Sequence, residues 1–228
     1  MPKLTLISGF AGLLACAALF AQAPKPAGQP APKPQAPTDK PAQGAAETVA
    51  VLQTKLGNIV VKFFPDKAPN HVKNFENLCR SGFYNGTKFH RIIPGFMIQG
   101  GDPNTRGGDP STWGTGGNTD KSGQEIHVKA EFNNIHHVRG ILSMARSQHP
   151  DSASSQFFIC VADAGYLDGQ YTAFGQVIAG MDVADAIVNA PRKPGDRPVT
   201  PVAIDRAYLE QRPVTPPGAQ PPAAPPAK

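Results

Sequence analysis

FHRIIPGFMIQGGD, which spans residues 89–102, is the most informative stretch of this sequence. It is mostly apolar, yet it contains one arginine, Arg91, and one glutamine, Gln99. In a strand alternate side chains share a face, so Arg91 lies with Ile93. Beyond a Pro-Gly break, Gln99 lies with Met97 by the same rule. Because a permanent cation is costly to desolvate beside apolar groups, we interpret Arg91 and Gln99 as functional residues.

A second apolar block, SSQFFICV at residues 154–161, is typical of a buried strand, with Phe157 and Phe158 on opposite faces. It follows another strand-like run, GILSMAR at 140–146, and precedes YLDGQYTAFGQV at 166–177. No Ser, Cys or carboxylate near the first block is arranged as a nucleophile, which argues against covalent catalysis.

These segments together resemble the cyclophilin-type peptidyl-prolyl cis-trans isomerases. The resemblance covers roughly residues 48–209 and depends on six pieces in the family's order: FHRIIPGFMIQGGD at 89–102, GTGG at 114–117, GILSMA at 140–145, SSQFFIC at 154–160, LDG at 167–169 and FGQV at 174–177. Each piece alone is a weak signal, but the ordered set over one domain is specific. It implies an enzyme that accelerates rotation about X–Pro bonds, with Pro-containing polypeptides as partners.

The distribution of proline defines the domain organisation. Of the 25 prolines in 228 residues, seven fall in residues 24–41 and seven in residues 213–226. We therefore predict one domain at 47–212, large enough to bury a substantial core, between a disordered Pro/Ala-rich linker at 24–46 and a disordered Pro-rich tail at 213–228.

The net charge of +5 does not indicate a nucleic-acid-binding protein. Residues 47–212 carry 17 basic and 16 acidic side chains, so most of the excess lies in the flanks. A nucleic-acid-binding domain concentrates basic residues on its folded part, and this sequence has neither such a cluster nor a zinc-finger motif.

Residues 1–23 predict an export signal, because Lys3 precedes a long apolar run. Ala21-Gln22-Ala23 has the form of a signal-peptidase site, although Pro24 would follow the cut. The segment ending at Cys16 resembles a bacterial lipobox, in which the cysteine is lipidated and tethers the protein to a membrane. A single-pass anchor is a third alternative. We predict an exported bacterial form, either periplasmic or anchored on the extracytoplasmic side, and a monomer.

The remaining pattern is mainly β. Residues 48–54 and 59–64 form a predicted hairpin, and helices are predicted at 69–81 and 181–189. Further strands are predicted at 89–93, 96–100, 126–132, 139–145, 156–161 and 172–177, and residues 199–209 close the domain. This pattern favours a closed antiparallel sheet but does not choose between a barrel and a sandwich. The resemblance implies the closed eight-stranded antiparallel barrel capped by the two α-helices. The long loop 102–125, with Trp113, has the length of a segment that walls a groove.

Rotation about an X–Pro bond needs no nucleophile, metal or cofactor, since no bond breaks. The barrier is about 18–20 kcal/mol, and a cation aimed at the prolyl nitrogen stabilises the twisted amide, in which that nitrogen regains its lone pair. Arg suits this role because its guanidinium is planar and always charged. We therefore predict Arg91 as the electrostatic group and Gln99 as the residue that holds it.

The resemblance also implies the residues that bind substrate. These residues line the proline pocket, pair through their backbone with the substrate chain, or lie beside the residues that do. They are Phe96, Met97, Ala145, Arg146, Gln156, Phe158, Tyr166, Leu167 and Tyr171. Three of them depart from the common pattern, since many members carry Asn, Trp and His where this chain has Arg146, Tyr166 and Tyr171. The Tyr166 position shapes cyclosporin binding in the family, so we predict weaker inhibition here.

The cysteines and histidines are not predicted to form a functional site, and two alternative functions stay open. Cys79 and Cys160 are predicted to be buried thiols, although a bridge between them stays open. The six histidines lack metal-ligand spacing, and His90 is predicted on the strand face opposite Arg91. A proline-peptide-binding or chaperone module with little turnover is the alternative function, and a structural envelope protein is a third.

Overall fold

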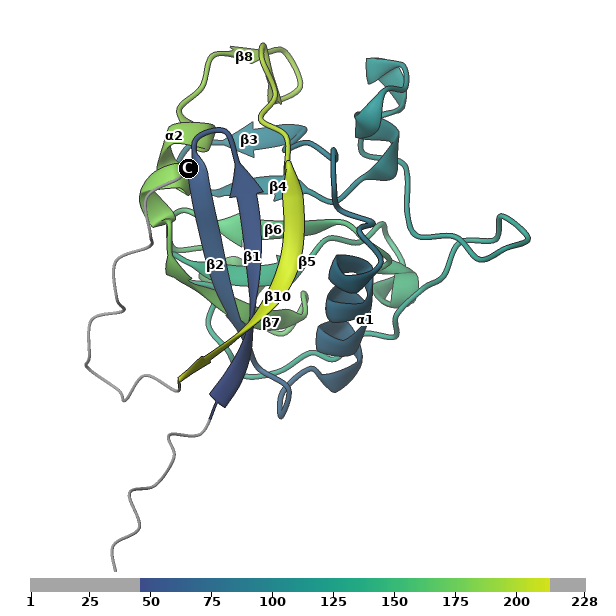
Figure 1. Cartoon of the computed structure of the whole chain (residues 1–228), viewed down its shortest axis with the longest axis vertical. Coiled ribbons are helices and arrows are strands. Elements are labelled where there is room, and N and C mark those ends of the chain that lie inside the picture. The colour runs from purple at the N-terminus through teal and green to yellow at the C-terminus, as the bar shows by residue number, and fades with distance from the viewer. Residues whose placement is uncertain (1–45, 214–228) are drawn as a thin grey trace, which may run out of the picture. The chain divides into compact units, whose positions relative to one another are not determined.

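The computed structural model of the chain describes residues 46–213 (Figure 1). The elements in this range are ten strands and two α-helices: β1 (Ala46–Thr54), β2 (Gly57–Phe63), α1 (Pro69–Arg80), β3 (Arg91–Ile93), β4 (Met97–Gly100), β5 (Ile141–Met144), β6 (Phe157–Cys160), β7 (Ala173–Ala179), α2 (Met181–Val188), β8 (Arg192–Lys193), β9 (Arg197–Pro198) and β10 (Arg206–Pro213). The mainly β architecture with two helices is confirmed.

Eight of the strands form one antiparallel sheet in the order β10-β1-β2-β7-β5-β6-β4-β3, while β8 and β9 pair separately. In the described residues no ladder joins the end strands β10 and β3. Backbone hydrogen bonds between residues 86–89 and 202–204, with an isolated bridge from Lys88 to Ala203, link these two ends instead. A closed eight-stranded barrel is therefore not confirmed.

The β1–β2 hairpin shows how alternation sorts side chains between two layers. Val49 and Val51 of β1 pack with Val60 of β2 on one face. The residues that alternate with them along β1, Ala50 and Leu52, belong to the main core. The turn closes where Thr54 faces Gly57, whose φ of +130° suits glycine.

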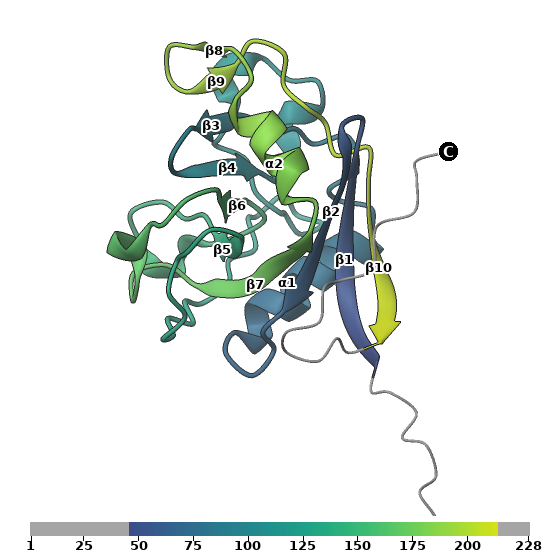
Figure 2. The same cartoon turned by 90° about the vertical axis from the view of Figure 1, so that its left-hand side faces the viewer.

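Helix α1 has the predicted apolar stripe. Val72, Phe75, Leu78 and Cys79 are buried, and Pro69 occupies the first turn. The two helices lie toward opposite ends of the sheet, with α1 packed on β10 and β7 and α2 packed on β2 and β4 (Figure 2). Their predicted ranges, 69–81 and 181–189, each extend one residue beyond the observed end.

The aromatic residues of β6 divide the interior into two clusters. Phe157 belongs to the main core, where its ring centroid lies 5.3 Å from that of Phe75. Phe158 belongs to a second cluster with Met97 and Leu167. The prediction that these two aromatic side chains point to opposite faces is confirmed, and the second cluster forms the floor of the site described below.

The predicted strand at 126–132 is wrong. Within it only Val128 makes a bridge, to Ala153, while the backbone N–H groups of Ala130 and Glu131 bind the side chains of Asp151 and Thr172. The alternating pattern is present, but its backbone groups find these side chains instead of a ladder partner. The segment 199–209, predicted to close the domain, leads from the β8–β9 hairpin through an irregular stretch into the final strand, which begins at Arg206.

The predictions for residues 1–23, for Cys16 and for most of the linker and the tail lie outside the described residues. Within residues 46–213, no helix has the length and apolar character needed to cross a membrane. Cys79 and Cys160 are free thiols, so the alternative of a bridge between them is wrong. Burial raises the pKa of both thiols to about 12.

Candidate functional site

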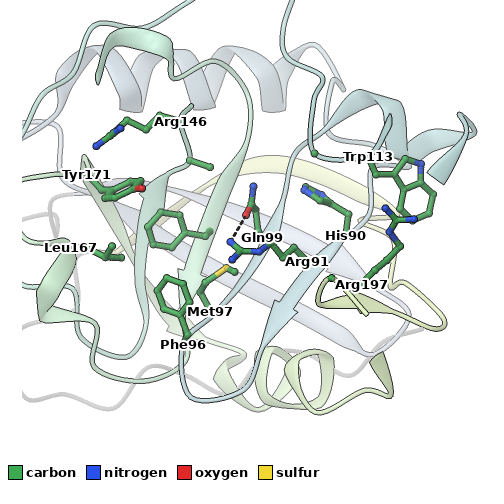
Figure 3. Close-up of a pocket in the computed structure, with 14 residues that line it drawn as sticks. His90, Arg91, Phe96, Met97, Gln99, Trp113, Arg146, Leu167, Tyr171 and Arg197 are labelled. Carbon is green, nitrogen blue, oxygen red and sulfur yellow. Dashed lines mark hydrogen bonds between the residues drawn. The ribbon is translucent and has the colours of Figure 1, made fainter. Parts of the chain in front are cut away.

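A pocket of about 440 Å³ opens over the second cluster (Figure 3). Strands β3, β4, β6 and β9 and the segments that connect the strands contribute its lining: His90, Arg91, Phe96, Met97, Gln99, Trp113, Gly114, Ala145, Arg146, Phe158, Leu167, Tyr171, Gly195 and Arg197. Eight of the residues predicted from the sequence, together with Arg91, therefore meet at one place.

The β3–β4 hairpin brings the predicted cation and amide together. Arg91 and Gln99 are directly opposed in the ladder, and Gly95 supplies the left-handed residue of the turn, with φ +73°. The Nη1 of Arg91 lies 3.4 Å from the Oε1 of Gln99, which is a long hydrogen bond. The expected contact is present, and it orients the guanidinium without consuming its charge.

Gln99 is itself held by a relay of amide groups. Its Nε2 donates to the Oε1 of Gln156 at 2.9 Å. The Nε2 of Gln156 then donates to the backbone carbonyl of Gly116 at 2.8 Å. A Cβ at Gly116 would collide with the side chains of Asp102 and Asn104, so the loop approaches only because this residue is glycine. The relay connects Arg91 to the loop that the sequence predicted as a groove wall.

A carboxylate approaches Arg91 from the other side. The Oδ2 of Asp196 lies 4.0 Å from the Nε of Arg91, and its Oδ1 lies 3.1 Å from Arg192. The backbone of Asp196 accepts a hydrogen bond from Ile92 at 2.8 Å. This contact fixes the β8–β9 hairpin against β3, so Arg91 lies between an amide and a partly exposed carboxylate.

The floor of the pocket is apolar. Met97 is 1 % exposed and Phe158 is 5 % exposed. The Tyr171 ring meets the Phe158 ring edge to face, with centroids 5.9 Å apart, and Phe96 lies 6.4 Å from Phe158. A ring the size of proline can bury its apolar surface on this floor while its amide nitrogen lies near Arg91.

A Ser–His–Asp arrangement lies beneath Phe158. His137 contacts the Asp168 carboxylate through Nδ1 at 2.9 Å and the Ser143 hydroxyl through Nε2 at 3.0 Å. Hydrogen bonds from His136 and His137 hold the pKa of Asp168 well below its usual range. Ser143 is fully buried and also lies 3.0 Å from the Thr172 carbonyl oxygen.

This arrangement is not a nucleophilic centre, because the hydroxyl has no access to substrate. The His137 ring stacks on Phe158 with centroids 6.2 Å apart and an interplanar angle of 19°. It therefore supports the pocket floor from below.

Two of the departures from the family pattern pair with each other. The Arg146 guanidinium carbon lies 4.6 Å from the centroid of the Tyr171 ring. Its nitrogens also donate to the backbone carbonyls of Gln170, Ser147 and Gln148, at 2.9–3.2 Å. Arg146 thus ties the end of β5 to the loop that carries Tyr171 and gives that wall its shape.

Two predicted residues do not line the pocket. Gln156 lies behind Gln99 and faces a neighbouring hollow that shares Gln99, Ala145 and Arg146 with the pocket. Tyr166 is 64 % exposed at the rim, where its ring centroid lies 5.7 Å from that of Phe96. The structure therefore brings Tyr166 near the site but not into it.

Besides two glycines, three lining residues were not among the predicted site residues: His90, Trp113 and Arg197. His90 faces the same pocket as Arg91, contrary to the prediction, because β3 begins at Arg91 and strand alternation does not apply before it. Trp113 and Arg197 come from segments without periodicity. The length of loop 102–125 was the signal for Trp113, and no sequence signal pointed to Arg197.

The chemistry of this site is electrostatic. Within residues 46–213 no cluster of three or more His, Cys, Asp or Glu residues has the arrangement of a metal site. A guanidinium held at the edge of an apolar pocket can stabilise charge that develops on a bound amide.

Comparisons with known proteins agree with this geometry. The family model described as "Cyclophilin type peptidyl-prolyl cis-trans isomerase/CLD" matches residues 49–209. A peptidyl-prolyl cis-trans isomerase of Acinetobacter baylyi is 44 % identical over 156 residues, covering 66 % of this chain and 77 % of that protein. One of Arabidopsis thaliana is 43 % identical over 164 residues, covering 72 % and 96 %.

Solved structures agree as well. A Cryptosporidium parvum cyclophilin-type isomerase, crystallised in the presence of the dipeptide Ala-Pro, superposes with a TM-score of 0.63 at 32 % identity. The match covers 71 % of this chain and 98 % of that one.

Proposed function

This chain belongs to the cyclophilin-type peptidyl-prolyl cis-trans isomerase family, and we propose that it performs the reaction through Arg91, without covalent chemistry. It is a peptidyl-prolyl cis-trans isomerase. The observation that carries the mechanism is the position of the Arg91 guanidinium, held by Gln99 at the edge of the apolar floor.

The mechanism follows from the electronic structure of the amide. In the planar X–Pro bond the nitrogen lone pair is delocalised, and rotation removes that conjugation against a barrier of about 18–20 kcal/mol. The twisted nitrogen regains its lone pair and accepts a hydrogen bond from Arg91. Since this interaction exists in the twisted amide and not in the planar one, it lowers the barrier rather than merely binding substrate.

The other residues position the substrate. Phe96, Met97, Phe158 and Leu167 hold the proline ring and exclude water. The backbone at Ala145–Arg146, directly after β5, pairs with the substrate chain in the manner of an added strand. Gln99 and Gln156 keep the guanidinium in the orientation that the twisted amide requires.

The substrates are Pro-containing polypeptides. The presence of the dipeptide Ala-Pro in the crystals of the Cryptosporidium parvum relative supports this assignment. We further propose that the protein is exported and acts outside the cytoplasm, supported by the leader-like composition of residues 1–23. Mass spectrometry of the mature N-terminus tests this, because a lipidated Cys16, a cut after Ala23 and an uncleaved chain have different masses.

Substitution of Arg91 tests the mechanism. In a protease-coupled isomerisation assay we expect Arg91→Ala to lower kcat/KM by roughly 10²–10³-fold, the usual effect of removing one transition-state donor. Arg91→Lys should recover part of the loss. Arg80→Ala is the matched control, since Arg80 pairs with Glu76 on the surface of α1. The circular dichroism spectra of the variants should match that of the wild type.

The same assay decides between catalysis and simple binding. A chaperone or proline-peptide-binding module would bind peptides with little turnover, and Arg91→Ala would leave its slow rates unchanged. Equal rates for the wild type and Arg91→Ala would therefore overturn the proposed mechanism.

A further inference from the structure

Arg197, at the start of β9, carries a guanidinium that no group of residues 46–213 engages by a hydrogen bond or an ion pair. Its guanidinium carbon lies 5.6 Å from the centroid of the Trp113 ring, and its charge also acts on the carboxyl group of Asp109, which it helps to keep ionised by lowering the pKa. The other two arginines of the lining donate hydrogen bonds, Arg91 to Gln99 and Arg146 to backbone carbonyls. An uncommitted cation on the wall of a substrate pocket is suited to bind an anion.

His90 lies in the same part of the pocket and also lacks a partner. It is 5 % exposed, and neither of its ring nitrogens has a hydrogen-bond partner in the described part of the chain. A buried polar group without a partner is destabilising, so a bound ligand that satisfies it gains affinity. Burial lowers the pKa of His90, against a smaller opposing effect of Asp102, so the ring is neutral at pH 7 and offers one donor and one acceptor.

The two ends of the pocket differ in their residues (Figure 3). Arg146 and Tyr171 form one end, Trp113 and Arg197 form the other, and Arg91 lies between them. At the second end a Cβ on Gly195 would meet nothing within 4 Å, so that part of the wall has open space in front of it. A polypeptide that pairs with Ala145–Arg146 and crosses the pocket reaches this open end.

We propose that His90, Trp113 and Arg197 form a second subsite that binds an acidic side chain of the substrate polypeptide, an inference that rests on the proposed isomerase function. Arg197 pairs with the carboxylate, and the Trp113 ring holds the guanidinium plane and packs on the methylene groups. His90 binds a peptide group of the same substrate segment. The three arginines of the lining, with no carboxylate among the lining residues, disfavour Lys and Arg at that position.

The experiment measures catalysed isomerisation of peptides by NMR exchange spectroscopy, which needs no coupling protease. Each peptide contains a central Ala-Pro. The two positions on either side of it are varied one at a time, and each carries Glu, Gln or Lys in turn. At one position we expect kcat/KM to be roughly three- to tenfold higher for Glu than for Gln, and lower again for Lys. Because the three peptides are compared within each protein, a change in basal activity cancels from the ratio.

Variants assign the preference to Arg197. Arg197→Gln should reduce the Glu-to-Gln ratio to about 1, and Arg197→Lys should retain part of it. Lys193→Gln is the matched control, because Lys193 faces Arg197 in the β8–β9 ladder but does not line the pocket. It removes the same charge from the same hairpin and should leave the ratio unchanged.

Trp113 gives an independent readout, because it is the only tryptophan in the chain. Titration with the Glu peptide should change its fluorescence at lower concentration than titration with the Gln peptide, and Arg197→Gln should abolish the difference. A Glu-to-Gln ratio of 1 at every position in the wild type would contradict the subsite, as would an equal fall of this ratio in Arg197→Gln and Lys193→Gln. In either case, turnover of the Gln peptides would show that the isomerase function itself is intact.

Discussion

At the scale of single residues, the site depends on how a flexible arginine is held. Arg91 is about half exposed, so its side chain would sample many rotamers without contacts. Gln99 restrains it from one side and Asp196 from the other, and Gln156 restrains Gln99 in turn. The catalytic geometry therefore comes from three different segments of the chain.

Breaking the amide relay should slow catalysis without removing the cation. We predict that Gln156→Leu lowers kcat by roughly tenfold, because one hydrogen bond of about 1–1.5 kcal/mol no longer fixes Gln99. Stopped-flow isomerisation assays check this, with Gln170→Leu, which lies at the far wall, for comparison. A change confined to KM would show that Gln156 binds substrate instead of orienting Arg91.

Tyr166 permits a prediction about inhibition. It lies at the exposed rim beside Phe96, at a position that shapes cyclosporin binding in the family. We expect Tyr166→Trp to bind cyclosporin roughly tenfold more tightly, since the indole adds apolar contact area and a donor. Inhibition titrations of wild type and variant measure the difference, and equal affinities would contradict the prediction.

The sequence predicted Arg91, Gln99 and the pocket floor because strand alternation and family motifs both apply there. It placed His90 wrongly because the strand begins at Arg91, two residues after the predicted start at 89. Arg197 was beyond prediction, since a two-residue strand has no periodicity and its contact with Trp113 joins residues 84 positions apart in the chain.

At the scale of elements, α1 begins in an unusual way. Ala68 precedes it and offers no side chain to cap the first turn. The Glu131 carboxylate does so from a distant loop, accepting hydrogen bonds from the backbone of Asn70 and His71 at 3.1 and 3.0 Å. It also lies 2.7 Å from the Nδ1 of His71. Residues 126–132 thus serve the fold as a cap for α1 rather than as the predicted strand.

Removing this cap should destabilise the domain. We predict that Glu131→Ala lowers the free energy of unfolding by about 1–3 kcal/mol, because the buried His71 and the first turn of α1 lose their acceptor. Urea titrations followed by circular dichroism measure the change. Glu210→Ala is the control, because Glu210 pairs with Arg212, two residues along β10, and accepts no hydrogen bond from α1 in the described residues. An unchanged midpoint for Glu131→Ala would mean that water replaces the carboxylate fully.

At the scale of the whole molecule, several buried titratable groups respond to pH in the same direction. Burial lowers the pKa of His71 and of His90. Burial opposes ionisation of Glu131, but hydrogen bonds from His71 and Asn70 outweigh it and lower the pKa. In each case the unfolded chain binds a proton more readily than the folded one, so acid favours unfolding.

We therefore predict that stability falls as the pH drops below about 6.5, the ordinary pKa of histidine. Each histidine contributes a slope of up to about 1.4 kcal/mol per pH unit until its folded pKa is reached, and Glu131 adds a further loss below about pH 4.5. Urea unfolding between pH 4 and 8 measures this. His71→Gln should flatten the slope, whereas His127→Gln, at an exposed position, should not.

The order of the sheet and the link between its ends could not be predicted from local pattern. Residues 86–89 bond to residues 202–204, more than 110 positions away, through backbone groups that carry no sequence signal. Periodicity and turn signals predicted the mainly β pattern and the two helices. The contact between residues 86–89 and 202–204 follows the β8–β9 hairpin in the chain, and it belongs to no regular ladder.

The two thiols of the domain are sealed in its interior, and burial keeps both protonated. A thiol reacts as its thiolate, so peroxide, glutathione and disulfide-exchange catalysts find no point of attack on these two residues of the folded domain. We therefore expect residues 46–213 to fold without a disulfide and to keep their structure under reducing and oxidising conditions alike.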